Sequence, residues 1–291
     1  MKTAYKFRIY PNKAQESKLD LTLEVCRQLW NLALDDRKTT WKQEHKGRSY
    51  EDQCSLLTIE KKYNLHFSSV YSQVLQDVLK RLKKAFDNFF RRCREGAKKK
   101  GYPRFKNKGQ YKSITYPQSG FKLDGARLTL SKIPGSIRVF KHREIEGTIK
   151  TCTIKKDGTG AWYVIFVAET TTEESIKIEP KTAIGVDLGI SHAVVTYEDQ
   201  IFDYPKYYVK AQKKIRSANK SLHRKVKGSQ NRANARHKLS VVNKRVTNLR
   251  DEFLHQVSRK LVDSADVVAF EDLNITDKIK NHNLAKHISR T

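Results

Sequence analysis

Apolar residues recur every three or four positions in two long stretches of the first hundred residues, the pattern of helices with one buried face. The first stretch follows the segment "PNKAQ", in which Asn12 and Gln15 have the spacing of a helix-capping box. The other predicts a helix from about 69 to 94. We also expect a short strand over 5–10, before the first helix, and a further helix over 49–63.

Between residues 111 and 170 the apolar period shortens to two, which is typical of strands. Short alternating runs are separated by the turn pairs Asp124-Gly125 and Asp157-Gly158. This pattern predicts an antiparallel sheet, which we expect to form a small barrel. The polar segment "TTTEESIKIEP" (170–180) is predicted to be a linker.

A carboxylate interrupts the next apolar run, "KTAIGVDLGISHAVVTYED". Ile184, Val186, Leu188 and Ile190 alternate around Asp187, so a buried strand is predicted with one acid in it. A buried strand should exclude an ionised group unless that group is paired or used. Asp187 is therefore a candidate functional residue, followed by a hairpin return of the strand.

Residues 206–250 contain 15 Lys or Arg and no Asp or Glu. From 239 onward this basic segment also carries apolar residues at steps of three and four, which indicates a helix with one buried face: Leu239, Val242, Val246, Leu249, Phe253, Val257 and Leu261. The segment "KVKGSQN" (225–231) has the composition of a turn. We therefore predict a basic helical hairpin. A phosphate-binding surface is the favoured interpretation, and a solvated helix pair is the alternative.

A second acid follows this hairpin in "SADVVAFEDLNI". Residues 267–270 are predicted to form a short buried strand that ends at Glu271. If this strand lies beside the one that carries Asp187, both carboxylates reach one edge of the sheet. Such a pair repels unless a divalent cation lies between them, and Mg²⁺ held by carboxylates supports phosphodiester cleavage. In the plainer alternative, Asp187 shapes a turn and Glu271 caps the next helix.

The charge balance favours a polyanionic partner. Lys and Arg number 59 against 31 Asp and Glu, which gives a net charge of +28. The segment 91–108 alone holds nine basic residues and one acid, with Tyr102 and Phe105 among them. Its aromatic faces could stack on bases, and a solvated loop is the alternative.

Several classes of protein are disfavoured. No apolar run has the length of a membrane span or of a signal peptide. The four cysteines contain no CxxC pair, so no zinc site is expected. We therefore expect a cytoplasmic, nucleoid-associated protein without a membrane partner.

Taken in order, these motifs resemble the TnpB family, the OrfB-type RNA-guided nucleases of insertion sequences, which are related to type V CRISPR effectors. The similarity runs over essentially the whole chain. It rests on "YKFRIYPNKAQ", "VLQDVLKRLKKAFDNFFRR", "GYPRFKNK", "GVDLGI", the basic helices and "FEDLNI". "GVDLGI" and "FEDLNI" look like the first and second motifs of a RuvC nuclease domain.

The resemblance implies an α+β multi-domain fold. A wedge-type β-barrel (1–11 and 111–180) would carry an inserted helical recognition lobe (12–110). An RNase H-like (RuvC) α/β domain with the basic helical hairpin would follow (181–291). The long hairpin between the two acids makes a DDE-type transposase less favoured.

The resemblance also implies partners and site residues. The partners would be a guide RNA and double-stranded target DNA. Asp187 and Glu271 would be catalytic ligands of Mg²⁺ in a two-metal site. The expected nucleic-acid contacts are Tyr50, Gln76, Arg104, Lys106, Arg224, Lys225, Arg232, Arg236 and Lys238.

One departure from the family pattern bears on activity. After "FEDLNI" the family continues to a four-cysteine zinc ribbon and a third catalytic Asp, whereas this sequence ends at "NLAKHISRT". We therefore expect a truncated member whose cleavage is weak or absent. Three possibilities stay open: a guided DNA endonuclease, a guided DNA binder or repressor that does not cut, and an inactive transposase remnant.

Overall fold

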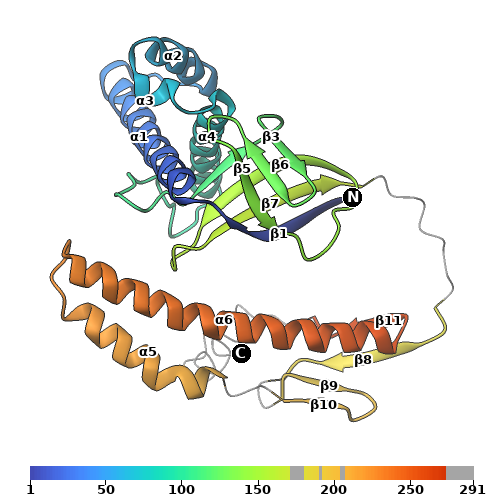
Figure 1. Cartoon of the computed structure of the whole chain (residues 1–291). Coiled ribbons are helices and arrows are strands. Elements are labelled where there is room, and N and C mark those ends of the chain that lie inside the picture. The colour runs from blue at the N-terminus through green and yellow to red at the C-terminus, as the bar shows by residue number, and fades with distance from the viewer. Residues whose placement is uncertain (171–179, 190–191, 204–206, 273–291) are drawn as a thin grey trace. The chain divides into compact units, whose positions relative to one another are not determined.

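The computed structural model describes residues 1–170, 180–189, 192–203 and 207–272, which belong to two compact units. The first unit spans Met1–Glu173 and the second spans Glu174–Thr291. In Figure 1 the first unit combines helices with a curled sheet, and the second combines a long helical hairpin with a smaller sheet. Among the described residues, no helix is both long and apolar enough to cross a membrane.

The helices of the first unit follow the predicted pattern closely. They are α1 (Lys13–Glu44), α2 (Tyr50–Tyr63), α3 (Leu65–Ser68) and α4 (Ser72–Arg94). The capping box at the start of α1 is confirmed: Asn12 Oδ1 accepts from the Gln15 amide, and Gln15 Oε1 accepts from the Asn12 amide. The short helix α3 was not predicted, and the helix expected from about 69 begins at Ser72 instead.

The antiparallel sheet predicted for the first unit is also confirmed. Its strands are β1 (Lys2–Tyr10), β2 (Ser113–Tyr116), β3 (Phe121–Asp124), β4 (Arg127–Leu130), β5 (Ser136–Phe140), β6 (Thr148–Lys156) and β7 (Trp162–Glu169). They pair in the order β2-β6-β7-β1-β5-β4-β3. The sheet is curled (Figure 1). Among the described residues, however, no pairing joins the outermost strands β2 and β3, so the expected closure into a barrel is not seen.

The core of the first unit lies between the inner face of this sheet and the helices. Phe7 and Ile9 on β1, and Val164 and Phe166 on β7, are each at most 1% exposed. The buried Gln15 amide joins α1 to the sheet, because its Nε2 donates to the carbonyls of Pro134 and Ser136. The capping residue of α1 therefore also fixes where that helix begins relative to the sheet.

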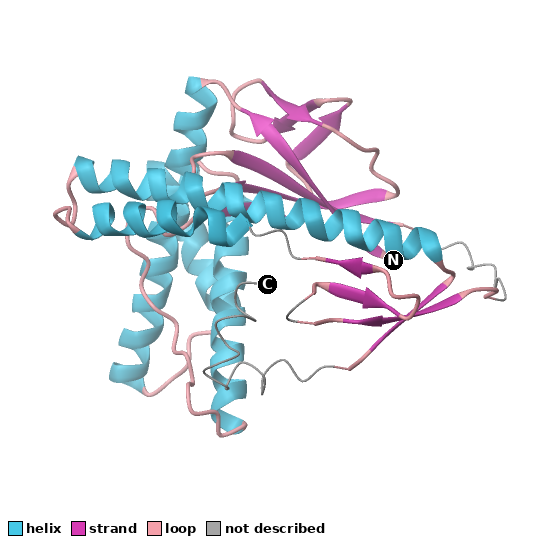
Figure 2. Cartoon of the chain, turned by 90° about the horizontal axis from the view of Figure 1, so that it is seen from below, coloured by secondary structure: helices cyan, strands magenta, loops and turns pink. Residues whose placement is uncertain are grey.

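The second unit contains a four-stranded sheet and the predicted basic helical hairpin (Figures 1 and 2). Its strands pair in the order β10-β9-β8-β11, and β8 and β11 run parallel. The elements are β8 (Ala183–Asp187), β9 (Val194–Thr196), β10 (Ile201–Phe202), α5 (Tyr207–His223), α6 (Gln230–Ser264) and β11 (Val267–Phe270). Every residue of the apolar stripe predicted for α6 is buried or half-buried. The turn predicted at 225–231 overlaps the α5–α6 connection.

Two predictions about buried strands were wrong. The strand over 267–270 is largely exposed, with Val267 at 41% and Phe270 at 55%. The described residues of this unit cover little of β11, because Val268 alone among the residues of this strand packs against the small core. Leu188 is 42% exposed because β8 ends at Asp187, before the predicted alternation is complete. Ile190 and most of the predicted linker at 170–180 lie outside the described residues.

Asp266 fixes the parallel alignment of β8 and β11. Its Oδ2 accepts hydrogen bonds from the amides of Lys181 and Thr182, at 3.0 and 3.1 Å, and from the Thr182 hydroxyl at 3.0 Å. The Asp266 amide in turn donates to the Thr182 hydroxyl. These hydrogen bonds hold the pKa of Asp266 below its ordinary value. The hydrogen bonds of Asp266 therefore join the starts of two strands that are far apart in sequence.

We predict that Asp266→Ala lowers the thermal stability of the second unit at pH 7, because three donors lose their acceptor. A group with a lowered pKa contributes stability above its unfolded value, near pH 4, and loses that contribution as the pH falls through the folded value. The difference from the parent protein should therefore shrink at pH 3. Far-UV circular dichroism reports the helices of both units, and fluorescence of the three Trp residues reports the first unit alone.

Asp263→Ala is the matched control, because Asp263 lies nearby and its ion pair with Arg259 is exposed on the surface of α6. It should change the melting curve very little. Equal effects of the two substitutions would contradict the assigned role of Asp266.

Candidate metal and nucleic-acid sites

The two candidate catalytic acids lie at the same end of two neighbouring strands. Val186 and Phe270 are opposite one another in the parallel register of β8 and β11. Asp187 is the next residue on β8, and Glu271 is the first residue after β11. Since neighbouring strands are about 4.8 Å apart, the backbones of the two acids are adjacent.

The two acids also share a face of the sheet. Ile184 and Val186 point into the core formed with α6, so the alternation along β8 puts Asp187 on the opposite, exposed face. Glu271 follows directly after the last paired residue of β11, so the same alternation would put it level with Asp187, and it is exposed too. Two exposed carboxylates on adjacent strands are oxygen donors of the kind that Mg²⁺ takes, with water completing its shell. The donor set therefore fits a magnesium ion, although the described residues contain no cluster of three or more metal-ligating side chains.

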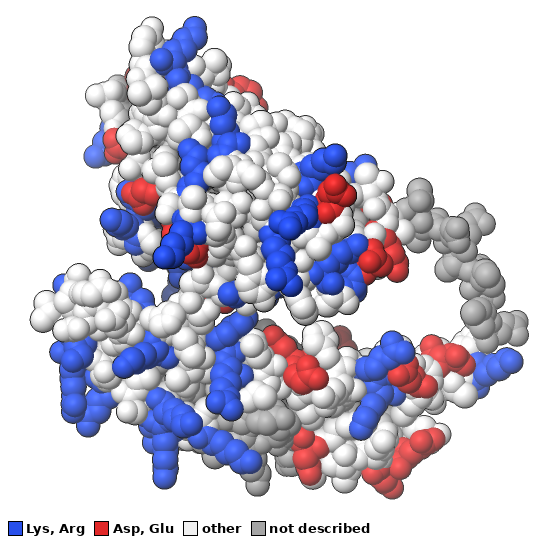
Figure 3. All heavy atoms as spheres, viewed as in Figure 1, with Lys and Arg blue, Asp and Glu red and all other residues white. Residues whose placement is uncertain are grey.

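The basic hairpin carries exposed cations around its turn. Figure 3 shows Lys and Arg side chains gathered over α5 and the half of α6 next to the turn, whereas Asp and Glu side chains lie over the other half of α6. Arg224 and Lys225 are exposed at the end of α5, where they line a hollow of about 200 Å³ together with Ser217, Lys220 and Ser221. Arg236 and Lys238 are exposed on the first turns of α6. All four of these expected nucleic-acid contacts are therefore open to solvent.

Arg232, another expected nucleic-acid contact, binds backbone atoms of the hairpin. Its Nη1 donates to the carbonyls of Leu222 and Lys225, at 3.0 and 2.8 Å. These carbonyls lie at the end of α5 and in the turn, so Arg232 holds the turn closed. A sequence pattern cannot separate this residue from its neighbours, because the partners of Arg232 are backbone atoms seven and ten residues away.

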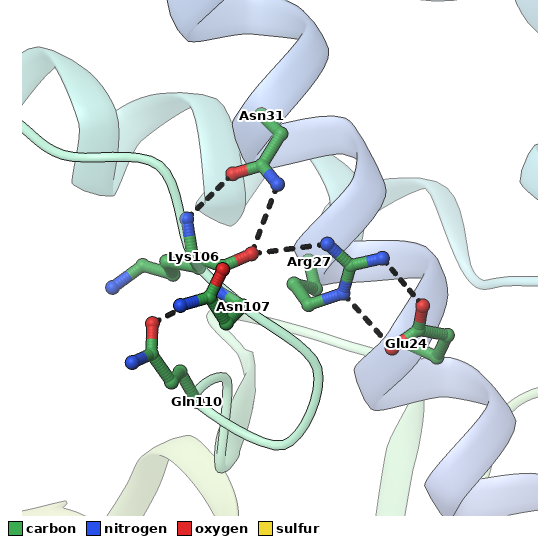
Figure 4. Close-up of polar contacts among 6 residues, drawn as sticks. All are labelled: Glu24, Arg27, Asn31, Lys106, Asn107 and Gln110. Atoms are coloured by element: carbon green, nitrogen blue, oxygen red, sulfur yellow. Dashed lines mark hydrogen bonds and ion pairs between the residues drawn. The ribbon is translucent and has the colours of Figure 1, made fainter. Parts of the chain in front are cut away.

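The basic loop after α4 is fastened to α1 by a polar network (Figure 4). Asn31 makes two hydrogen bonds with the backbone of Lys106: its Oδ1 accepts from the amide, and its Nδ2 donates to the carbonyl. Arg27 donates to the same carbonyl while its guanidinium pairs with Glu24. Trp30 Nε1 also donates to the carbonyl of Arg104. The loop backbone is therefore held at a fixed place on α1.

The two loop cations that were expected to bind nucleic acid lie in different environments. The Arg104 side chain is exposed. The Lys106 ammonium lies 4.4 Å from the centre of the Trp30 ring, and burial lowers the pKa of Lys106. Arg104 is thus the better placed of the two for a phosphate.

The loop aromatics contact protein rather than standing free. The Tyr102 ring packs edge-on against Phe86 and Phe89, and the ammonium of Lys38 lies 4.3 Å from the centre of the Phe105 ring. Both loop rings are nevertheless partly exposed, Tyr102 at 42% and Phe105 at 45%. Their first role is therefore to pack the loop against α1 and α4.

Tyr50 and Gln76 lie on different helices and in different environments. Tyr50 is the first residue of α2 and is half-buried against the core, where burial and then a hydrogen bond with Cys54 raise its pKa to about 12. Its hydroxyl therefore stays neutral at physiological pH. Gln76 is exposed on α4.

Three residues position the sites without having been predicted from the sequence, namely Asn31, Arg27 and Asp266. The only available signal is a polar residue close to an apolar stripe or just before a strand. That signal is common on surfaces and does not reveal the distant partner.

Two family matches bear on identity. Residues 166–282 match the OrfB_IS605 family, described as "Probable transposase", and residues 1–46 match a "Helix-turn-helix domain" of the same OrfB_IS605 group. In this chain the latter residues form β1 and α1.

Two curated relatives align with nearly the whole chain. A "Putative RNA-guided DNA endonuclease" of Streptomyces pristinaespiralis is 35% identical, over 99% of this chain and 71% of the relative. The "Putative RNA-guided DNA endonuclease InsQ" of Escherichia coli (strain K12) is 29% identical, over 96% of this chain and 68% of the relative.

A solved structure supports the fold. The chain is similar to a protein in the "Cryo-EM structure of the Cas12f1-sgRNA-target DNA complex", with a TM-score of 0.50 and 12% identity, over 96% of this chain and 70% of the other. At this identity the likeness bears on fold alone. The identity to the Streptomyces relative along nearly the whole chain, together with two segments matching one transposase group, shows that the chain belongs to the TnpB (OrfB-type) family.

Proposed function

We propose that this protein binds a guide RNA and uses it to recognise double-stranded DNA, with Asp187 and Glu271 as ligands of Mg²⁺ for cleavage of the DNA strand. One observation carries this proposal. The parallel register of β8 and β11 brings the two acids to one face and one end of a sheet, although 15 basic residues and no acids occupy positions 206–250 between them. The curated relatives named as RNA-guided DNA endonucleases support it.

In this proposal the first unit recognises the nucleic acid and the second unit carries the nuclease site. The curled sheet (1–11 and 111–180) acts as a wedge-like platform, and the helices of 12–110 form a recognition lobe. Residues 181–291 form a RuvC-like nuclease domain. Tyr50 and Gln76 on the recognition lobe are the proposed contacts to the DNA beside the target.

In this proposal the side chains of the protein position the metal ion and the nucleic acid. Asp187 and Glu271 hold the metal on the exposed face of the sheet, where a DNA strand can approach. A bound Mg²⁺ supplies activation of water and stabilisation of the developing charge on the phosphate. The cations around the α5–α6 turn hold the nucleic-acid backbone, whereas base pairing with the guide reads the sequence.

Guided binding without cleavage is the second candidate function. It requires the same basic surfaces but no metal chemistry, so the two candidates differ only in what the acids do. An inactive remnant would lack both properties. Variants of the acids and of the basic turn therefore test the two parts of the proposal separately.

We predict that Asp187→Asn and Glu271→Gln each lower Mg²⁺-dependent cleavage of guided DNA by about a hundredfold or more, because a metal ligand is lost. RNA affinity should stay within about twofold, since the hairpin cations are unchanged. Mn²⁺ binding, followed by electron paramagnetic resonance, provides a readout that does not depend on turnover and should weaken in both variants.

Glu198→Gln is the matched control, because Glu198 is an exposed acid in the turn between β9 and β10 of the same sheet. It should leave both metal binding and cleavage unchanged. If the parent protein binds guide and target but neither binds Mn²⁺ nor cuts, the binding-only function is supported. Cleavage that persists in the Asp187 variant would place the active site elsewhere.

We predict that Arg236→Glu combined with Lys238→Glu weakens RNA binding about tenfold at moderate salt, whatever the RNA sequence. The slope of log affinity against log salt should fall by roughly two, one for each lost phosphate contact. Filter binding across a salt series measures both quantities. Lys46→Glu with Lys62→Glu changes the net charge equally on the helical lobe and serves as the control.

Arg232→Ala should behave differently from this double variant. It should lower the free energy of unfolding by about 1–3 kcal/mol, because two carbonyls lose a charged donor. If the Arg236 and Lys238 reversal affected RNA binding no more than the control, the hairpin would not be the RNA-binding surface.

A further inference from the structure

A hollow in the helical part of the first unit differs from the rest of this basic chain in its lining. It has a volume of about 530 Å³ and lies between α1 and α2. Its floor is apolar and buried, and is formed by Leu29, Ala33, Leu57, Phe67 and Leu79. At the rim two leucines are open to solvent, Leu32 on α1 at 56% and Leu56 on α2 at 41%.

The hollow continues along α1 as a groove. A second hollow of about 470 Å³ shares Leu32 and Asp35 with the first and reaches Phe105 of the basic loop. The α1 residues that line the two hollows run from Arg27 to Glu44. At 1.5 Å per residue this stretch is about 26 Å long. We call the two hollows together the α1 groove.

The charges around the first hollow are mainly negative, although the chain as a whole carries +28. One cation, Arg48, lines it together with four carboxylates: Asp35, Asp36, Glu44 and Glu60. Asp36 is already engaged, because its two oxygens accept from Arg48 and from Gln53. The other three carboxylates form no ion pair among the described residues. They are therefore available to a cationic occupant.

The base of the first hollow is fixed by a buried polar link between the two helices. Gln53 of α2 is 4% exposed, and its Nε2 donates to the Ala33 carbonyl and to Asp36 on α1. Arg37 Nε donates to Gln53 Oε1. Thr40 lines the same hollow at 6% exposure, and its hydroxyl has no hydrogen-bond partner among the described residues. The hollow thus has a fixed base and one buried polar group that can still bond an occupant.

The shape and charge of the α1 groove fit one class of partner best. Nucleic acid is disfavoured, because unpaired carboxylates repel phosphates. A small organic cation would fill only part of a groove this long. An amphipathic helix fits better, because its apolar residues at i, i+3, i+4 and i+7 form a stripe that can lie along the groove. Lys or Arg residues beside that stripe would complement the carboxylates at the rim.

We propose that the α1 groove binds a cationic amphipathic helix of a partner protein, whose apolar stripe covers Leu32 and Leu56. The Lys or Arg residues of that helix meet Asp35 and Glu60 at the rim. This inference goes beyond the proposed function, because neither guide binding nor cleavage requires a protein partner. It makes the helical lobe a docking surface for protein as well as the proposed contact to DNA.

The test uses two synthetic peptides of about 15 residues with the same leucine stripe. One has Lys beside the stripe and the other has Glu, and both have Gln on the outer face. Each carries fluorescein and is titrated with the full chain after nuclease treatment and a high-salt wash have removed nucleic acid. Fluorescence anisotropy measures the affinity.

The net charge of the chain and the α1 groove predict opposite preferences. A charge of +28 on its own would favour the Glu peptide. At physiological salt, however, charges farther away than about 8 Å are largely screened, whereas the rim carboxylates would touch the peptide. The Lys peptide should therefore bind about tenfold or more tightly than the Glu peptide.

Two double variants separate the apolar from the electrostatic contribution. Leu32→Ala with Leu56→Ala should weaken binding of the Lys peptide about tenfold or more, because exposed apolar area that the helix would cover is lost. Asp35→Asn with Glu60→Gln should weaken it about fivefold and should also reduce its salt dependence. All four side chains are exposed, and circular dichroism checks that the variants are folded.

Matched controls lie outside the groove. Leu254→Ala with Val262→Ala removes two exposed apolar side chains from α6. Glu51→Gln with Glu198→Gln removes two exposed acids. Neither control should change the affinity by more than about twofold. A Lys peptide with Pro at its centre should lose binding, because Pro interrupts the helix.

Each outcome decides the proposal. Preferential binding of the Lys peptide that both groove variants weaken supports it. Preference for the Glu peptide, or an affinity that the Leu32 and Leu56 variant leaves unchanged, overturns it. Equal binding of the Pro-containing peptide overturns the helical occupant. If sedimentation shows that the chain self-associates and that only the groove variants are monomeric, the occupant is a second copy and the partner-protein assignment is overturned.

Discussion

The parallel pairing of β8 and β11 is the constraint on which the candidate metal site depends. These strands lie about 80 residues apart, and their register decides whether Asp187 and Glu271 stand side by side or one residue apart on opposite faces. Asp266 fixes that register at the other end of the strands by accepting three hydrogen bonds from Lys181 and Thr182. The acids can therefore remain exposed and available to a ligand, because another carboxylate provides the alignment.

In the basic surfaces, too, one residue fixes the backbone while other residues stay exposed. Arg232 closes the α5–α6 turn through two backbone carbonyls, which leaves Arg236 and Lys238 exposed on the surface. Asn31 holds the backbone of the loop after α4, so that Arg104 stays exposed while its own carbonyl is bound by Trp30. In each case one polar residue bonds backbone atoms and fixes a segment that carries exposed charged side chains. Pre-positioned cations lose less conformational entropy when they meet a phosphate.

Local patterns in the sequence predicted much of this fold, because caps, turns and apolar periods depend on nearby residues. The Asn12–Gln15 capping box and the basic hairpin were accessible in this way. The pairing of the two acid-bearing strands could be posed only as a condition, because strands about 80 residues apart carry no local sign of it. The exposure of β11 was not, because strand composition does not reveal which side chains other elements cover. The inward position of Lys106 and the structural role of Arg232 depend on partners that periodicity does not identify. The roles assigned to Asp187 and Glu271 stay predictions.

The central claim is that this chain holds one particular RNA rather than any polyanion, which its net charge of +28 would equally attract. The most direct measurement is to express the protein with its native flanking DNA, purify it at moderate salt and sequence the RNA that copurifies. If the chain binds a guide, one discrete RNA with a constant portion and a variable end should copurify. A mixture of ribosomal and transfer RNA fragments would contradict it and would leave only a generically basic surface.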